Sequence, residues 1–133
     1  MARVLVVEDN PRLNTLALKV LCGHGHQVEQ AADGATGVEL ALAKCPDVVL
    51  MDISLPGMDG LEATRRIKLA CPDLPVAALT AHAMPSDRER ALEAGCDCVI
   101  TKPYAIADLL ACVERLAARS VPAAAVPAQD GTA

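Results

Sequence analysis

The sequence has almost no aromatic residues. It contains no phenylalanine, no tryptophan and one tyrosine, Tyr104. A protein that carries a flavin usually packs aromatic rings against it, and the flavin phosphate needs a loop rich in glycine and hydroxyl groups. The first apolar run here is followed by Glu8-Asp9-Asn10-Pro11, which would repel a phosphate unless a metal intervened. A flavin carrier is therefore a poor interpretation.

Long hydrophobic runs and basic clusters are also missing. No apolar stretch approaches the roughly 18 residues of a membrane span, and the N-terminus has no basic segment followed by an apolar core. The 12 Lys and Arg residues are dispersed and outnumbered by 17 Asp and Glu residues, which gives a formal charge of -5. Such a surface repels nucleic acid. We expect a cytoplasmic protein that binds neither membranes nor nucleic acid.

The six cysteines form no C-x-x-C motif, and their spacing is irregular. Most of them fall within or at the ends of expected helices, where a free thiol behaves as a small hydrophobic side chain. We interpret them as reduced core thiols. His24 and His26 lie in a glycine-containing turn, which is more typical of turn residues than of metal ligands.

What the chain does have is a series of short apolar runs that end on polar residues. Residues 48–52 finish on Asp52, a few positions before a Leu-Pro-Gly turn. Such runs are typical of buried parallel strands, and ligands of open α/β sheets lie at the carboxyl ends of the strands. We therefore expect one site built from the residues at these ends: Glu8, Asp9, Asp52, Thr80 and Lys102.

Helical patterns separate the runs. Asn10 before a proline is typical of a helix start. Asp59 and the glutamate three residues later have the spacing of a capping box, and so do Ser86 and its glutamate. The apolar residues expected to face the sheet are Leu13, Leu16, Ala17, Val20 and Leu21, then Val38, Ala41 and Leu42, then Leu61 and Ile67, and finally Ile106, Leu109, Leu110, Val113, Leu116 and Ala117.

Five strand-helix units with short loops require a parallel sheet covered by helices on both faces. We predict the α/β class, as a three-layer flavodoxin-like sandwich with strand order 2-1-3-4-5, one of the two common orders of such sheets. The 53% hydrophobic content supports a folded core in a single domain, residues 1–119. Residues 120–133 are rich in Ala and Pro without a period, and we expect a flexible tail or the start of a linker.

The expected site favours phosphoryl chemistry. Glu8, Asp9 and Asp52 would repel one another unless a cation offset them, and ligation by oxygen alone favours Mg²⁺, or Mn²⁺. Lys102 supplies a positive charge and Thr80 a hydroxyl for phosphoryl oxygens. Asp52 is itself a nucleophile that can attack phosphorus, so no general base is needed.

Five motifs together resemble the receiver domain of two-component response regulators, of the single-domain type. Each motif is weak alone, but the five in this order and at these strand ends are specific. The resemblance covers about residues 3–118. The motifs are Glu8-Asp9-Asn10, Met51-Asp52, Leu55-Pro56-Gly57-Met58-Asp59-Gly60, Leu79-Thr80-Ala81 and Thr101-Lys102-Pro103.

The resemblance implies a function in a phosphorelay. A histidine kinase or histidine phosphotransfer protein would donate phosphate to Asp52, and the domain would catalyse its own dephosphorylation without turning over a separate substrate. Mg²⁺ would be bound by Asp9, Asp52 and the backbone carbonyl of Ser54, with Glu8 holding a metal-bound water. Thr80 and Lys102 would contact the phosphoryl group, and protein contacts would carry the signal to a downstream protein.

Two alternatives stay open. An aspartyl phosphatase would want a second acid two residues after the nucleophile, where this chain has Ser54. A receiver-like docking module that is never phosphorylated is the more serious alternative. One departure from the family concerns Val99: many receivers carry an aromatic residue there, so we expect the aromatic switch to be absent or replaced. The proximity of Met1 to the first strand favours a stand-alone regulator.

Overall fold

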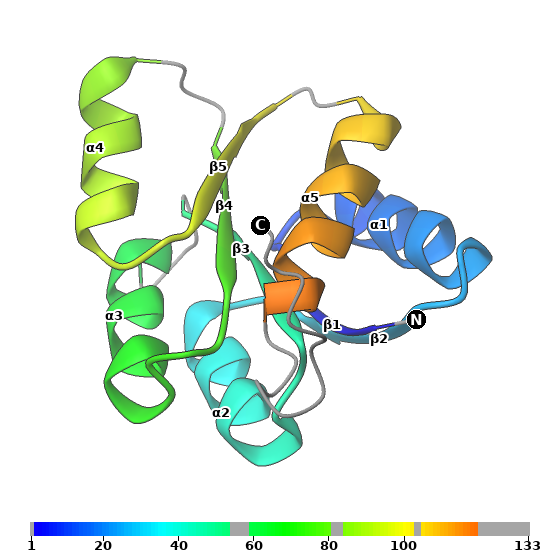
Figure 1. Cartoon of the computed structure of the whole chain (residues 1–133), viewed down its shortest axis with the longest axis horizontal. Coiled ribbons are helices and arrows are strands. Elements are labelled where there is room, and N and C mark those ends of the chain that lie inside the picture. Colours follow the sequence, from blue (N-terminus) through cyan, green and yellow to red (C-terminus); the bar gives the residue numbers. More distant parts are fainter. Residues whose placement is uncertain (1, 54–58, 81–83, 103–104, 120–133) are drawn as a thin grey trace, which may run out of the picture.

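The protein forms a five-stranded parallel sheet in the order β2-β1-β3-β4-β5. The computed structural model describes residues 2–53, 59–80, 84–102 and 105–119, with the side chain of residue 119 left out. Figure 1 shows the strands running through the centre of the molecule. The strands are β1 Arg3–Val7, β2 Gln27–Ala31, β3 Val48–Asp52, β4 Val76–Thr80 and β5 Cys98–Thr101.

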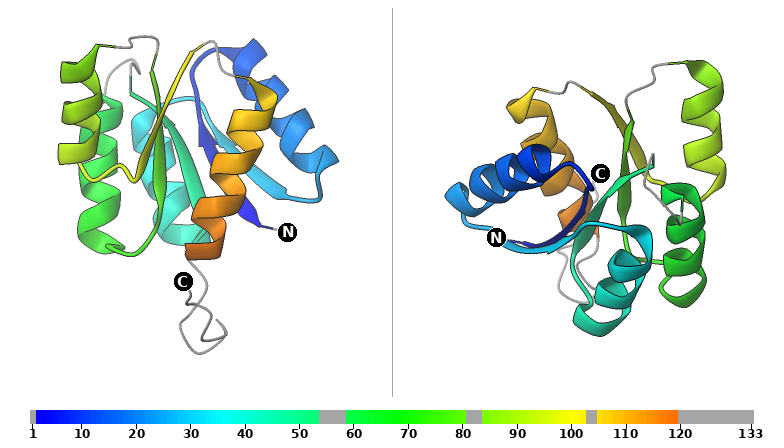
Figure 2. Two further views of the ribbon diagram at one scale, coloured as in Figure 1. Left: turned by 45° about the horizontal axis from the view of Figure 1, so that its top comes forward. Right: turned by 180° about the vertical axis from the view of Figure 1, so that it is seen from behind.

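Helices cover both faces of the sheet and make the predicted three-layer sandwich. Figure 2 shows α1 and α5 on one face, with α2, α3 and α4 on the other. Right-handed crossovers between neighbouring parallel strands produce this distribution. The predicted α/β class and strand order are thus confirmed. The helices are α1 Pro11–Gly23, α2 Gly34–Lys44, α3 Gly60–Ala70, α4 Pro85–Glu93 and α5 Ile106–Arg119.

The core consists of two aliphatic clusters, one on each face of the sheet. Strand residues alternate between them, so that Val4 and Val6 face one cluster while Leu5 and Val7 face the other. The α1/α5 cluster includes Val4, Val6, Leu21, Leu50, Leu79, Leu109, Val113 and Leu116. The α2/α3/α4 cluster includes Leu5, Val7, Val49, Met51, Ile67, Val76 and Ala78.

Helix starts agree with the sequence prediction at α1 and α3 but not at α4. Asn10 accepts hydrogen bonds from the first turn of α1, and Asp59 accepts one from Leu61 N at 2.6 Å. The predicted cap at Ser86 is wrong, because Ser86 already lies inside α4: the helix begins at Pro85, and Met84 takes the cap position, two residues earlier than predicted. Proline suits the first helical position, where its missing N–H would have no partner, and this preference outweighs the capping-box spacing.

Three apolar residues that were expected to face the sheet are exposed: Leu16, Leu42 and Ile106. Helix α2 shows the reason. A Cβ added to Gly37 would lie only 2.7 Å from a methyl group of Val7, so the helix lies very close to the sheet through small residues. A close approach of this kind buries a narrow stripe of the helix, and Leu42 falls outside it.

Helix α5 spans Ile106–Arg119. The predicted tail, residues 120–133, lies outside the described residues. Within the described ranges, no helix has the length and apolar character needed to span a membrane.

Candidate active site at the carboxyl end of the sheet

The three predicted metal-binding carboxylates converge at the carboxyl ends of β1 and β3. These strands pair in parallel with Val7 opposite Met51, so the residues that follow them are neighbours. One carboxylate oxygen from each of Glu8, Asp9 and Asp52 lies within 4.8 Å of the others. Glu8 and Asp52 are only 2% and 3% exposed, whereas Asp9 is exposed to solvent. Two buried acids and one accessible acid therefore lie together at this edge of the sheet.

Among the described residues, Lys102 is the only cationic side chain that contacts Glu8 and Asp52. Its Nζ lies 2.7 Å from Glu8 Oε1 and 3.2 Å from Asp52 Oδ2. Its backbone N–H donates to the carbonyl oxygen of Thr80 at 2.6 Å, which joins the end of β5 to the end of β4. Thr80 is buried, next to the strand that carries Asp52. The structure thus brings together all the predicted site residues except Ser54, which lies outside the described residues.

One lysine does not balance the negative charge of this site. Burial, and then a hydrogen bond shared with Asp52, raise the pKa of Glu8 from 4.5 to about 7 despite the opposing effect of Lys102. Burial alone would lower the pKa of Lys102, but its hydrogen bond to Glu8 and the charge of Asp52 raise it. Two buried carboxyl groups that share one lysine favour binding of a further positive charge, which would let both ionise. The oxygen-only donor set and this charge deficit fit a hard divalent ion such as Mg²⁺.

Binding of Mg²⁺ is expected to depend on pH through Glu8. Between about pH 4.5 and pH 7, Glu8 keeps its proton in the metal-free folded protein but loses it in the unfolded chain. The contribution of Glu8 to the free energy of unfolding therefore falls as the pH rises through this range. An ion that binds the ionised site displaces that proton. We expect the rise in unfolding temperature caused by Mg²⁺ to be larger at about pH 8 than at about pH 6, with roughly tenfold tighter binding.

The measurement is a thermal unfolding series with and without Mg²⁺ at each pH. Other groups also titrate in this range, for example His26, because burial lowers its pKa. Their effects on the unfolding temperature cancel when the series with and without Mg²⁺ are compared at the same pH. A Glu8→Gln variant serves as the control, because it should bind Mg²⁺ with little pH dependence. Equal stabilisation of the unmodified chain at both pH values would contradict the prediction.

Asn14 is a positioning residue that the sequence analysis missed. It lies on the buried side of α1, and its Nδ2 donates to the carbonyl oxygens of Glu8 at 2.9 Å and Ala31 at 3.2 Å. Its Oδ1 accepts from Gln30 Nε2 at 2.7 Å. Asn14 therefore fixes the backbone of Glu8 from behind. A signal was present, because Asn14 precedes Ala17 and Leu21 by three and seven positions on the buried stripe of this helix.

An Asn14→Ala substitution is expected to destabilise the fold by about 2 kcal/mol, since it removes two hydrogen bonds to buried carbonyls. Freeing the Glu8 backbone should also weaken Mg²⁺ binding several-fold. Chemical unfolding and a Mg²⁺ titration measure the two effects. Thr15→Ala, at the neighbouring exposed position of α1, is the matched control. Unchanged stability in the Asn14 variant would show that these bonds do not hold the site.

Gly60 closes one of the five sequence motifs, but its structural role is evident only from the contact between α3 and β3. It is the first residue of α3, and a Cβ at this position would overlap the carbonyl oxygen of Asp52 and approach Ile53 Cα to 2.5 Å. Only a glycine lets the start of α3 lie directly against the end of β3. Asp59, which caps this helix, therefore helps to fix the strand end that carries Asp52.

Comparison with known proteins gives a consistent result. A family model described as the response regulator receiver domain matches residues 4–114. The response regulator MprA of Mycolicibacterium vanbaalenii is 37% identical over 120 residues, which cover 90% of this chain and 52% of that protein. The chain therefore spans about half the length of the curated relatives it matches.

Two solved structures illustrate the structural similarity. A CheY-like receiver domain protein from Methanospirillum hungatei has a TM-score of 0.85 and 27% identity, and the match covers 90% of this chain and 96% of that one. The receiver domain of a sensor histidine kinase from Pseudomonas aeruginosa has a TM-score of 0.82 and 37% identity, covering 88% of this chain and 98% of that one. The latter holds a magnesium ion in its active site cleft.

Proposed function

Because this chain belongs to the family of response regulator receiver domains, we propose that Asp52 accepts a phosphoryl group from the phosphohistidine of a histidine kinase or a histidine phosphotransfer protein. The observation that carries the proposal is the meeting of Asp52, Glu8, Asp9 and Lys102 at one edge of the sheet. Structural ion pairs rarely bury two acids with a single lysine, because the second negative charge costs free energy. Function explains this arrangement better than stability does.

The chemistry requires little beyond positioning and charge. An Asp52 oxygen attacks phosphorus, the bond between phosphorus and the donor nitrogen breaks, and the product is an acyl phosphate on Asp52. Lys102 Nζ lies 3.2 Å from an Asp52 oxygen, close enough to hold a phosphoryl oxygen attached there. The Thr80 hydroxyl supplies a further hydrogen bond. The acyl phosphate is later hydrolysed by water, which regenerates the carboxylate of Asp52.

The metal site we propose consists of Asp9, Asp52 and the backbone carbonyl of Ser54, with Glu8 holding a metal-bound water. Mg²⁺ held by these residues would offset the carboxylate charges and supply positive charge for the phosphoryl oxygens. Mn²⁺ offers similar oxygen chemistry and is an alternative ion. The raised pKa of Glu8 and the accessible carboxylate of Asp9 support this arrangement.

The output of the domain is proposed to be a protein contact in the cytoplasm. The net charge of -5 favours protein partners over nucleic acid for this chain. Residues 1–119 would carry the receiver function, and residues 120–133 a flexible segment. Val99, which takes the place of an aromatic residue in many receivers, is half-buried against the α2/α3/α4 cluster. We keep the prediction that an aromatic switch is absent or replaced.

The proposal is tested by intact-protein mass spectrometry after incubation with a small-molecule phosphodonor and Mg²⁺. One phosphoryl adduct is expected. It should be cleaved by hydroxylamine, as an acyl phosphate is, and should map to the peptide that contains Asp52. A sample with chelated metal is the control and should remain unmodified. If neither the small-molecule donor nor a competent phosphotransfer protein produces an adduct, the receiver-like docking module that is never phosphorylated replaces this proposal.

A further inference from the structure

Two thiols meet between the last strand and the last helix, away from the phosphoryl site. Cys98 is the first residue of β5, and Cys112 lies within α5. Their sulfur atoms are 3.1 Å apart, with Cys112 buried and Cys98 partly exposed. A disulfide has a sulfur separation of about 2.05 Å, so the two atoms need to approach by only about 1 Å. The sequence predicted unpaired core thiols and did not foresee this contact.

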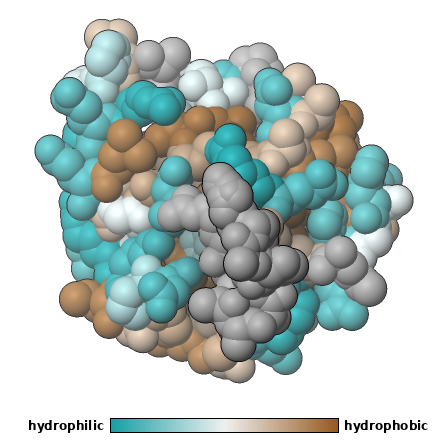
Figure 3. Space-filling model, in the orientation of Figure 1, coloured by the Kyte–Doolittle hydropathy of each residue, from teal (hydrophilic) through white to brown (hydrophobic). Residues whose placement is uncertain are grey.

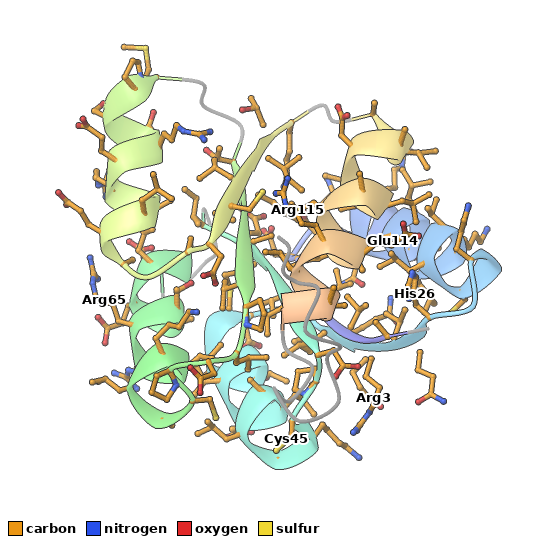
Figure 4. The ribbon with its side chains drawn as sticks, viewed as in Figure 1. Arg3, His26, Cys45, Arg65, Glu114 and Arg115 are labelled. Carbon is orange, nitrogen blue, oxygen red and sulfur yellow. The ribbon has the colours of Figure 1, made fainter. Side chains whose placement is uncertain are left out.

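Arg115 gives the two sulfurs different chemical characters. Its guanidinium Nη2 donates to the Cys98 sulfur at 3.2 Å, and Figure 4 shows Arg115 extending from α5 toward β5. The Cys98 sulfur thus accepts from a cation and from the Cys112 thiol. Burial, and then the hydrogen bond to Cys98, raise the pKa of Cys112 to about 12, so this residue remains protonated. The cation beside the Cys98 sulfur and the hydrogen bond that Cys112 donates to it identify Cys98 as the sulfur that reacts first.

Small molecules can reach this pair. A cavity of about 410 Å³ lies between β5 and α5, lined by both cysteines and by Thr101, Asp108, Ala111 and Arg115, among others. Asp108 carries the opposite charge, but Arg115 is the residue in contact with sulfur. Figure 3 shows apolar residues gathered over β5 in the region between α4 and α5. The pair therefore lines an open cavity that a small oxidant can enter.

We propose that Cys98 and Cys112 form a redox-active dithiol, which a hydroperoxide oxidises to an intramolecular disulfide that joins β5 to α5. The Cys98 thiolate attacks a peroxide oxygen, the O–O bond breaks, and Cys98 becomes a sulfenic acid while the peroxide is reduced to an alcohol, or to water. The Cys112 sulfur then attacks the Cys98 sulfur. The S–O bond breaks, and the oxygen leaves as water with the Cys112 proton. Two thiols and one hydroperoxide give one disulfide, one alcohol and one water.

This disulfide would constrain the segment that holds Lys102. The loop closed by residues 98 and 112 contains Thr101 and Lys102, and the backbone of Lys102 is joined to Thr80. Oxidation would therefore join α5 to the strand that leads to Lys102, at a distance from the phosphoryl site. The reaction does not depend on phosphorylation of Asp52, and its test is separate from that of the proposed function.

The test treats the reduced full chain with one equivalent of hydrogen peroxide and then alkylates the remaining thiols. We expect the intact mass to show four alkylated cysteines of six and the loss of two hydrogens, with Cys98 and Cys112 joined in a peptide map. The unfolding temperature should rise by about 5 °C or more and return after reduction. A disulfide elsewhere, a cross-link between chains or six alkylated cysteines would overturn the proposal.

Variants separate the two sulfurs. Cys112→Ala should stop at a sulfenic acid on Cys98, which a dimedone-type nucleophile traps. Cys98→Ser should resist the same dose of peroxide, and Arg115→Gln should slow the reaction about tenfold. Cys22→Ser, at an exposed position of α1, is the matched control and should form the disulfide as the unmodified chain does. Equal reactivity of the Cys98→Ser variant and the unmodified chain would contradict the assignment of Cys98.

Discussion

An Asp52→Asn variant is expected to take up no phosphoryl group and yet to unfold at a higher temperature than the unmodified chain in metal-free buffer. The amide is not a nucleophile toward phosphorus, so the adduct disappears completely. Stability rises because two buried carboxyl groups no longer share one lysine. Glu8 loses the neighbour whose hydrogen bond and charge help to raise its pKa, and Lys102 keeps its 2.7 Å bond to Glu8. A gain of about 1 kcal/mol corresponds to relief of less than one pKa unit.

The same variant should lose most of its affinity for Mg²⁺, and with it the stabilisation that the ion gives. Thermal unfolding with and without Mg²⁺, beside the phosphorylation assay, measures all three effects. Asp59→Asn is the matched control. The Asp59 side chain is exposed, and asparagine can cap α3 as aspartate does. A variant at position 52 that unfolds more easily without metal would show that the ion pair with Lys102 outweighs the repulsion between the acids.

Replacing Gly60 with alanine is expected to be one of the most destabilising single changes in the chain. The added methyl group would overlap the backbone of Asp52 and Ile53, which cannot rotate away as a flexible side chain could. Either α3 or the end of β3 must shift. We expect a loss of about 3 kcal/mol, a large part of the 5–15 kcal/mol that stabilises a typical domain. Since the shift involves the Asp52 backbone, the folded fraction should also be phosphorylated more slowly.

Chemical unfolding at a temperature where both proteins are folded gives the comparison. Gly23→Ala is the matched control, because Gly23 ends α1 and a Cβ there would meet no atom within 4 Å. Alanine is a better helix former than glycine, so this control should be neutral or more stable by up to about 1 kcal/mol. If the two variants were equally stable, the tight contact between α3 and β3 would not be a constraint on the fold.

The sequence predicted the architecture and the membership of the site for identifiable physical reasons. Apolar runs fixed the strands, and the rule that ligands gather at strand ends brought Glu8, Asp9 and Asp52 together. Thr80 and Lys102 follow from the same rule. These features depend on local patterns and on a small choice of sheet orders, so they can be read before any contact is known. The details of metal and phosphoryl binding remain predictions.

The sequence could not predict features that depend on contacts between distant segments. The helical spacing could have placed Asn14 on the buried stripe of α1, but its partner, the carbonyl of Glu8, is identified only by the structure. Gly60 resembles an ordinary helix start until α3 is placed against β3. Lys102 was expected to contact a phosphoryl group, and the structure shows that it binds Glu8 and Asp52. In each case the decisive partner lies in another element, and its distance is set by tertiary packing.

The sheet also separates two hydrophobic clusters that stabilise the fold independently of each other. The α1/α5 cluster and the α2/α3/α4 cluster share strands but use alternate side chains of them. A cavity on one side, as from Leu109→Ala, therefore does not change the surroundings of Ile67 on the other side. Free energies of substitutions on opposite sides should add, whereas those on one side should couple. The chain can thus accumulate substitutions in the cluster on one face without weakening the packing of the other.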